Sequence, residues 1–301
     1  MKMLLGYCCI STLNANLKCS QGSTKSWLER NTYEVSRAKL LDKANSNLAN
    51  LKRLLHANKA NKIFAFRIPE QLLPQSDLGY YDISEFATQL AEVGAIANKY
   101  GMQISQHPSQ YFVLNSTRPE VVDKTVKSLN MFADILDMMQ LKKVPNLTVH
   151  VGAKSGYATK QDACDAFCAG FEQLNDNAKR FLVVENDQNS FDITDCKYIH
   201  DKIGIPVVLD NAHHMFNTGG LTLAEAAAIA VPTWGDRIPK FHLSSEDEQP
   251  RHAHADYVTK EDYITFCRAI ASTGVDLVCI MLETKLKDKA LVELRRSAKK
   301  S

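Results

Sequence analysis

The sequence predicts a (β/α)₈ barrel that spans residues 1–301 as a single domain. Short apolar runs alternate with segments of helical periodicity, and a run of four to six apolar residues is typical of a buried parallel strand. A chain of 301 residues also has the usual length of such a barrel. An open doubly wound sheet is the alternative. That fold normally begins with a glycine-rich turn, and Gly6-Tyr7-Cys8-Cys9 is not one.

The first half of the chain supplies four expected strands with three helices between them. The strands are Leu4–Tyr7, Ile63–Ile68, Gln103–Gln106 and Asn146–Val149. A largely polar loop over 11–30 follows the first strand. The helices are Arg37–Ala57, in which leucines recur at helical spacing, a helix capped by Ser84 that runs to Tyr100, and one that starts at Pro119 and ends near Met139.

The second half repeats the alternation four more times. The expected strands are Phe181–Val184, Pro206–Leu209, Pro239–His242 and Leu277–Leu282. The expected helices are Thr159–Leu174 with a shorter one near Asn177, then Thr194–Ile203, Leu221–Ala230, Thr259–Thr273 and Ala290–Lys299. A polar loop is expected over 244–257. No linker or low-complexity segment divides the chain.

Composition excludes some classes of protein. Hydrophobic residues make up 45% and charged residues 23% of the chain, which is ordinary for a soluble globular protein. No run of eighteen apolar residues occurs, so no membrane span is expected. Eight cysteines without framework spacing favour a reduced, intracellular protein. A net charge of +2 neither requires nor excludes a nucleic-acid partner.

Side chains with metal-binding chemistry follow most of the expected strands. Because the carboxyl ends of barrel strands meet at one mouth, these side chains are expected to converge. From the third strand to the eighth they are His107, His150, Glu185, Asp210 with His213 one turn later, His242 with His252 and His254 in the next loop, and Glu283.

The mixture of imidazole and carboxylate indicates the kind of ion. Zn²⁺, Mn²⁺ and Fe²⁺ accept both ligand types, whereas Mg²⁺ and Ca²⁺ prefer oxygen alone. The candidates outnumber the ligands of one tetrahedral ion, so two or three divalent ions that share Glu185 as a bridge are expected. Without cations, buried Glu185, Asp210 and Glu283 would repel one another and lose hydration. His252 and His254 compete for one role.

Lys240 is expected inside the barrel as well. It lies two residues before His242, so both side chains point to the same face of the strand. A lysine in that position is unfavourable unless it is paired, neutral or modified. Three roles remain open: an ion pair with Asp210 or Glu283, a general base, or a carbamylated lysine that binds metal.

Seven motifs, in this order, resemble the UV damage endonuclease family. The similarity runs from Gly6-Tyr7 to the last helix, which is essentially the whole chain. The motifs are His107-Pro108-Ser109-Gln110-Tyr111, His150-Val151-Gly152, Val184-Glu185-Asn186-Asp187, Leu209-Asp210-Asn211-Ala212-His213-His214, Lys240-Phe241-His242-Leu243-Ser244-Ser245, His254-Ala255-Asp256-Tyr257-Val258, and Glu283-Thr284-Lys285 with Lys287-Asp288-Lys289-Ala290.

This resemblance implies a metal-dependent barrel similar to the apurinic-site enzyme endonuclease IV. It implies a DNA repair enzyme that nicks duplex DNA immediately 5′ to cyclobutane pyrimidine dimers and 6-4 photoproducts, and in some members at abasic sites. The cofactors would be two or three divalent ions, with Mn²⁺ favoured over Zn²⁺ or Mg²⁺. The expected protein is a monomer that binds no membrane and is cytoplasmic, in association with the nucleoid.

Carried over by motif, the resemblance also implies a metal-ligand set. One ion would be held by His107, His150 and Glu185, a second by Glu185, Asp210, His242 and Glu283, and a third by His213 and His254, with Lys240 in carboxylated form nearby. Glu185 and Lys240 would then be the catalytic residues.

Residues outside the ligand set would contact DNA. Gln110 and Tyr111 correspond to the pair that the family inserts into the duplex at the lesion, and Tyr7 to a tyrosine near the damage pocket. Candidates for phosphate contacts are Lys285, Lys287 and Lys289, with the loop residues Lys18, Lys25 and Arg30.

Two other functions fit part of the pattern. A metal-dependent sugar isomerase or epimerase would also carry Glu, Asp and His at strand ends, but it would need only one or two ions and a base. The third-ion pair of His213 and His254 and the Gln110-Tyr111 pair favour the nuclease. A catalytically inactive damage-binding protein would bind lesions in the presence of Mn²⁺ without nicking the DNA.

Overall fold

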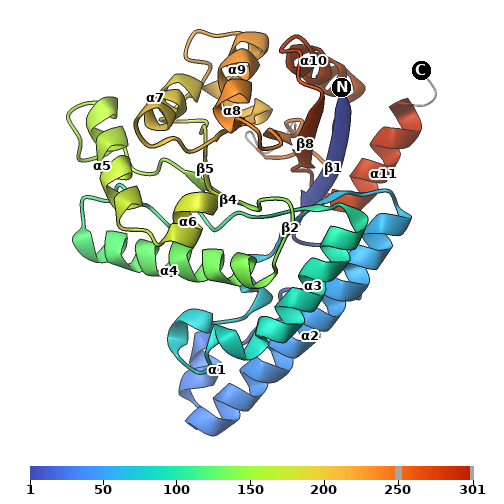
Figure 1. Ribbon diagram of the computed structural model, residues 1–301, viewed down its shortest axis with the longest axis vertical. Helices are drawn as coiled ribbons and strands as arrows, with labels where there is room; N and C mark the ends of the chain where they lie inside the picture. Colours follow the sequence, from blue (N-terminus) through green and yellow to red (C-terminus); the bar gives the residue numbers. More distant parts are fainter. Residues whose placement is uncertain (248–252, 299–301) are drawn as a thin grey trace.

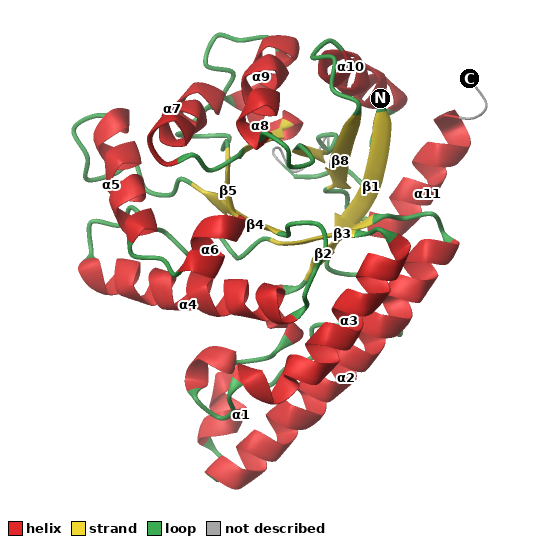
Figure 2. Ribbon diagram, viewed as in Figure 1, coloured by secondary structure: helices red, strands yellow, loops and turns green. Residues whose placement is uncertain are grey.

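The structure, a computed structural model, describes residues 1–247 and 253–298. Eight parallel strands close into a barrel in the order of the chain, and β8 pairs with β1. The strands form the centre and the helices surround them (Figures 1 and 2), which confirms the predicted (β/α)₈ barrel. The strands are β1 (Lys2–Cys8), β2 (Ala65–Ile68), β3 (Gln103–Gln106), β4 (Asn146–His150), β5 (Leu182–Glu185), β6 (Val207–Asp210), β7 (Lys240–Leu243) and β8 (Leu277–Leu282).

Helices form the outer layer of the described part of the chain. The α-helices are α1 (Lys25–Glu29), α2 (Tyr33–Ala60), α3 (Ala87–Tyr100), α4 (Pro119–Met138), α5 (Lys160–Glu172), α6 (Asp176–Phe181), α7 (Ile193–Ile203), α8 (Asn211–Phe216), α9 (Leu223–Ala230), α10 (Lys260–Ala271) and α11 (Lys287–Ala298). Short 3₁₀ helices are η1 (Glu70–Leu72), η2 (Ser76–Leu78), η3 (Ile83–Phe86) and η4 (Val231–Trp234). None of these helices has the length and apolar character needed to cross a bilayer.

Polar side chains set where several helices begin. The Thr259 hydroxyl accepts a hydrogen bond from the Asp262 N–H, which confirms the predicted start of α10. The helix predicted to begin at Ser84 begins differently. Asp82 accepts from the Ser84 N–H and starts η3, and α3 follows from Ala87. The sequence did not predict α1 and α8, because these two helices of five and six residues carry too few apolar positions to show periodicity.

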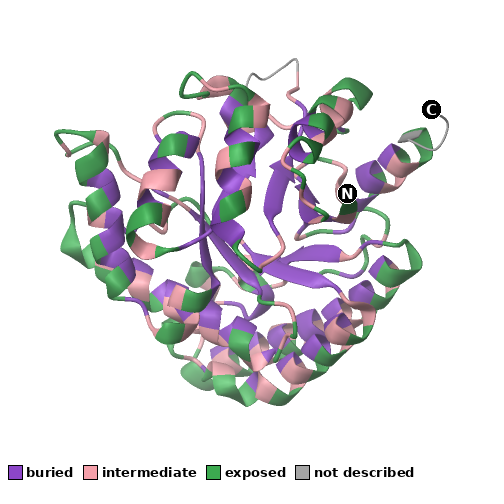
Figure 3. Ribbon diagram, turned by 45° about the horizontal axis from the view of Figure 1, so that its top comes forward, coloured by how far each residue is buried: buried purple, intermediate pink, exposed green. Residues whose placement is uncertain are grey.

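Alternation along the strands divides the barrel side chains between two layers. Phe66 and Phe241 belong to the main core between the strands and the helices. Ala65, Cys279 and Met281, at the alternate positions, form a separate cluster inside the barrel. The strands are buried along nearly their whole length, and the helices turn buried faces toward them (Figure 3).

An apolar cluster fills the inside of the barrel near the amino-terminal ends of β5 and β6. Val183, Val208 and Trp234 form a third apolar cluster there, and the Trp234 indole donates a 2.8 Å hydrogen bond to the carbonyl of Val207 at the start of β6. At the opposite side of the sheet, β1 approaches β2 so closely that a Cβ on Gly6 would lie 2.3 Å from the Ala65 carbonyl oxygen. Only glycine fits that position.

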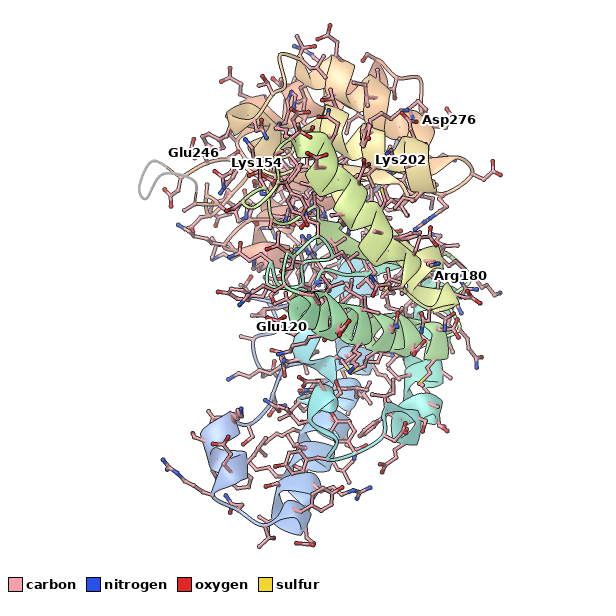
Figure 4. All side chains as sticks on the ribbon, turned by 90° about the vertical axis from the view of Figure 1, so that its left-hand side faces the viewer. Glu120, Lys154, Arg180, Lys202, Glu246 and Asp276 are labelled. Carbon is pink, nitrogen blue, oxygen red and sulfur yellow. The ribbon has the colours of Figure 1, made fainter. Side chains whose placement is uncertain are left out.

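The two ends of the barrel carry different connections. Lys154 and Glu246 follow strands β4 and β7, whereas Lys202 and Asp276 precede strands β6 and β8. Figure 4 shows the first pair on one side of the molecule and the second pair on the other. In a parallel barrel, active sites are built from the loops that follow the strands. The side that carries Lys154 and Glu246 is therefore the mouth of this barrel.

Candidate metal centre

The predicted ligands lie together at the mouth. His150, Glu185 and Asp210 are the last residues of β4, β5 and β6, and His242 lies in β7. The strand register places His150 beside Glu185 and Asp210 beside His242. Two further ligands directly follow their strands: His107 after β3 and Glu283 after β8.

Glu185 is at the centre of this cluster. Its carboxylate is 1% exposed and faces imidazoles from both sides. Oε2 lies 2.9 Å from Nε2 of His107 and 3.8 Å from Nε2 of His150. Oε1 lies 2.5 Å from Nδ1 of His242 and 3.7 Å from Nδ1 of His213. One buried carboxylate therefore lies against the imidazoles of four histidines.

Three overlapping groups of side chains could each hold a metal ion. Within each group the ligand atoms lie within 4.8 Å of one another. The groups are His107 with His150 and Glu185, Glu185 with Asp210 and His213, and Asp210 with His242 and Glu283. Glu185 belongs to the first two groups and Asp210 to the last two, so neighbouring ions would share carboxylates.

The polar atoms of Asp210 support a cation at this position. Asp210 is fully buried, and its Oδ1 caps α8 by accepting a 2.8 Å hydrogen bond from the His213 N–H. Its Oδ2 has no hydrogen-bond partner within the described residues. A buried carboxylate oxygen without a donor is strongly unfavourable unless a cation compensates it. The mixed imidazole and carboxylate set fits transition-metal or zinc ions.

Burial and neighbouring charges set the protonation of the cluster. Burial alone would raise the pKa of Glu185, but His242 and His150 lower it well below its usual value. Burial lowers the pKa of His107 to about 4, so this ring is neutral and has a lone pair for a metal. Burial opposes a charge on His213 too, yet Asp210 and Glu185 raise its pKa to about 9.

His254 lies at the edge of the cluster rather than inside it. Its Nε2 is 3.5 Å from Oε2 of Glu283, and its Nδ1 is 3.1 Å from the Ser244 hydroxyl. His254 is in none of the three ligand groups, but it lines a pocket of about 170 Å³ together with His213. The competing candidate, His252, lies outside the described residues.

Lys240 is fully buried inside the barrel, as predicted, and of the three roles left open for it the ion pair with Asp210 or Glu283 is not formed. Its Nζ donates a 3.2 Å hydrogen bond to the Thr148 hydroxyl, and within the described residues it pairs with neither Asp210 nor Glu283. Burial, followed by the nearby charge of Arg67, lowers the pKa of Lys240 to about 8. The amine is therefore partly neutral near physiological pH.

Arg67, rather than Lys240, forms an ion pair with Glu283. Its guanidinium is 7% exposed and pairs through Nη2 with Oε1 of Glu283. The same Nη2 lies 3.0 Å from Nε2 of His242. Arg67 was not among the predicted site residues. Its alternation with Phe66 on β2 was the signal that could have identified it, because the same rule placed Lys240 with His242.

Gln110 and Tyr111 are exposed on the loop that follows β3. Tyr111 is 78% exposed, the highest value among the large hydrophobic side chains of the described chain. Both residues line a pocket of about 400 Å³ that also contains His150 and His213. The loop therefore presents an amide and an aromatic ring directly beside the ligand cluster.

Tyr7 does not lie where the resemblance suggested. Its side chain is fully buried between β1 and α2, with its hydroxyl donating a 2.9 Å hydrogen bond to Oδ1 of Asn58. The ring also packs edge-on against Phe66, with centroids 5.1 Å apart. The expectation that Tyr7 contacts a DNA lesion is therefore wrong for this structure, because the side chain has no exposed surface.

The two proposed phosphate-binding lysines lie near the end of β8. Lys285 forms an ion pair with Asp247, in the loop that follows the neighbouring strand β7, which compensates its charge locally. Lys287 begins α11 and has a positive φ of 50°. Both lie within a few residues of Glu283, on the side of the barrel that carries the ligand cluster.

Comparisons with known proteins place this arrangement in a family. The model of the UV-endonuclease UvdE family matches residues 3–300. A UV DNA damage endonuclease from Halalkalibacterium halodurans is 32% identical over 98% of this chain and 94% of its own length. Another, from Clostridium perfringens, is 28% identical over 88% of this chain. The match covers 65% of the length of that relative.

Among solved structures, one resembles this chain over nearly its whole length and others share only the barrel fold. A crystal structure of SacUVDE superposes with a TM-score of 0.87 over 99% of this chain and 98% of its own, at 29% identity. A D-psicose 3-epimerase from Clostridium cellulolyticum has a TM-score of 0.53 over 77% of this chain and 79% of its own, at only 12% identity, which shows a shared barrel fold alone. The family match covers nearly the whole chain, including all the candidate ligands at the mouth, and it shows that this chain belongs to the UV-endonuclease UvdE family.

Proposed function

We propose that this protein is a DNA repair endonuclease that nicks duplex DNA immediately 5′ to UV photoproducts, namely cyclobutane pyrimidine dimers and 6-4 photoproducts. The reaction is phosphodiester hydrolysis assisted by two or three divalent ions, with Mn²⁺ as the first ion to test. Since its substrate is cellular DNA, the protein acts inside the cell. We further propose that it acts as a monomer.

The observation that carries this proposal is the overlap of the three ligand groups through Glu185 and Asp210. Shared carboxylates place neighbouring cations close together, which suits attack on a phosphorus atom between two oxygens that need stabilisation. Divalent ions bound there would supply an activated water and would neutralise charge on the phosphate. A sugar isomerase needs fewer ions than these groups offer.

The chain's own residues prepare this site before substrate arrives. Glu185 holds the imidazoles of His107 and His242 through its two oxygens, which fixes the orientation of both rings. Lys240 lies beneath the cluster against Thr148 and is partly neutral, so it is available for carboxylation by CO₂. A carboxylated Lys240 would add one oxygen ligand on the floor of the site.

Lesion recognition is assigned to the loop after β3. Photoproducts weaken stacking and pairing, so opening the duplex there costs less than opening intact DNA. The exposed ring of Tyr111 supplies a stacking face worth about 1–3 kcal/mol for a base. Gln110 supplies an amide that can bond the edge of a base left without its partner. Phosphates on either side would meet Lys285 and Lys287.

The test is a nicking assay on a labelled duplex that contains one thymine dimer, with Mn²⁺ and an undamaged duplex as control. The expected product is a single nick on the 5′ side of the dimer that leaves a 3′-hydroxyl, with no nick in the control. Lesion binding without nicking would select the inactive damage-binding protein instead. Absence of both binding and nicking, together with epimerisation of a ketose, would select the sugar epimerase.

A further inference from the structure

Arg67 is the one arginine within the described ligand cluster, and it contacts two of the candidate metal ligands with a single nitrogen. Nη2 pairs with Oε1 of Glu283 and lies 3.0 Å from Nε2 of His242. Both partners belong to the third ligand group, together with Asp210. The guanidinium therefore contacts Glu283 and His242, two side chains that a cation in that group would otherwise bind.

The hydrogen bond between Arg67 and His242 fixes the tautomer of the ring. Arginine can only donate, so Nε2 of His242 must accept and carries no proton. The ring proton then lies on Nδ1, 2.5 Å from Oε1 of Glu185, to which it donates. Without a cation, both hydrogen bonds of the His242 ring therefore have one donor and one acceptor.

A cation in the third ligand group requires the opposite tautomer. Nδ1 is the ring atom that faces the carboxylates, at 3.2 Å from Glu283 Oε1 and 3.9 Å from Asp210 Oδ2. If Nδ1 binds the cation, a neutral ring carries its proton on Nε2. That N–H would then face Nη2 of Arg67, and two donors cannot bond to each other.

A second feature shows that Arg67 is incompletely satisfied in its present position. Its Nε is buried without a hydrogen-bond partner among the described residues. A buried donor without an acceptor is unfavourable, and arginine binds best when its planar fork meets two oxygens. Arg67 is the next-to-last residue of β2, at the mouth, so phosphate oxygens of bound DNA can supply those acceptors.

We propose that Arg67 and a divalent cation are alternative partners of His242 and Glu283, and that cation binding releases the Arg67 guanidinium to a DNA phosphate at the mouth. This inference rests on the proposed metal centre. Arg67 then has two alternative sets of partners. It stabilises the acidic cluster before metal binds, and it binds substrate only when the site is loaded.

The first test measures Mn²⁺ binding to metal-stripped wild type and to Arg67→Gln by calorimetry. Competition predicts that the variant binds Mn²⁺ more tightly, by roughly tenfold or more, because no charged hydrogen bond has to be displaced. The metal-free variant should melt at a lower temperature, while the loaded forms should melt alike. An arginine that only supports the fold would instead weaken metal binding.

Two further variants serve as controls. Arg67→Lys keeps a donor-only cation at the position and should restore much of the wild-type affinity. In a Glu283→Gln background the shared carboxylate is lost, so Arg67→Gln should bring no gain. Equal affinity of wild type and Arg67→Gln would overturn the competition and leave the metal centre standing. Failure of both proteins to bind Mn²⁺ would overturn the metal centre and this inference together.

The second test examines the released position. A pre-nicked duplex with a thymine dimer cannot be cut again at that site, so its affinity can be measured at several salt concentrations with Mn²⁺ present. If the released guanidinium binds a phosphate, Arg67→Gln should lower the slope of log affinity against log salt by about one relative to wild type, and only in the loaded protein. An unchanged slope would overturn the phosphate contact.

Discussion

Oε1 of Glu185 lies 2.5 Å from Nδ1 of His242, at the point where the first and third ligand groups approach each other. This contact joins strands β5 and β7 across the mouth of the barrel. It makes Glu185 the residue whose loss affects the largest part of the site.

Replacement of Glu185 by Gln keeps the shape of the side chain and removes its charge. We expect nicking to fall by more than about a hundredfold, because even the residues that merely support metal ligands cost 10–100-fold when lost. Metal analysis of the purified variant should show fewer bound ions. Glu172→Gln, at an exposed ion pair with Lys179, is the matched control and should change neither quantity. Unchanged metal content in Glu185→Gln would contradict the bridging role.

Replacement of Tyr111 by Ala should weaken lesion selection and leave the metal centre intact. The loss of one stacking face predicts about a tenfold loss of preference for damaged over undamaged duplex. Stability should not change, because the ring is 78% exposed. Competition binding and thermal unfolding measure the two effects. Tyr33→Ala removes another exposed ring, 54% exposed on α2, and should have no effect on selection.

Replacement of Tyr7 by Phe separates the buried role of this residue from the expected lesion contact. The variant loses the hydrogen bond to Asn58 and leaves its Oδ1 without that donor, so we expect a loss of about 1–2 kcal/mol in the free energy of unfolding. Preference for damaged duplex should stay at the wild-type level. A large loss of preference with unchanged stability would show that Tyr7 reaches the lesion after all.

Metal affinity should rise with pH because of His213. Its pKa of about 9 in the metal-free cluster means that the ring is protonated at neutral pH and must release the proton to bind a cation. Between about pH 6 and 9 this one group should raise the Mn²⁺ affinity by up to tenfold per pH unit, and the rise should level off above its pKa. Calorimetry in two buffers of different ionisation enthalpy would show the released proton. His213→Gln should give a shallower dependence.

The buried amine of Lys240 should make the metal-free protein more stable at alkaline pH. Burial lowers its pKa in the folded state from 10.5 to about 8. Between those values the unfolded chain binds more protons than the folded chain, so stability rises with pH. From about pH 8 to 10 the gain of wild type relative to Lys240→Met should be roughly 2 kcal/mol in urea unfolding. A parallel dependence in both proteins would show that Lys240 does not titrate in this range.

Most of the fold and the ligand set could be predicted because both follow from short-range patterns. The bounds of β3 and β8 agree with the sequence analysis residue for residue. His107, His150, Glu185, Asp210 and Glu283 then converge because strand ends in a parallel barrel share one mouth. Which three candidate ligands form each metal-binding group depends on the tertiary structure. Which of these side chains meet depends on strand register and on contacts between non-adjacent strands, such as Glu185 on β5 with His242 on β7.

The positions of Arg67 and Tyr7 were not predicted correctly from the sequence. Alternation places Tyr7 on the opposite face of β1 from Cys8, which lies inside the barrel, and this predicts a buried ring rather than a lesion contact. The same rule turns Arg67 inward beside Ala65. The pairing of Glu283 with Arg67 rather than with Lys240 could not be predicted, because the Arg67 side chain on β2 has to reach past β1 to the residue that follows β8 in the closed sheet.

Trp234, Val183 and Val208 fill the inside of the barrel near the amino-terminal ends of β5 and β6, and the candidate ligands lie at the opposite end, at the mouth. Damaged duplex and nicked duplex would both bind at this mouth, so an incised strand that stays bound blocks the next substrate. Added nicked duplex should therefore inhibit cutting competitively, and departure of the product, rather than bond cleavage, would then govern how often one protein molecule can act.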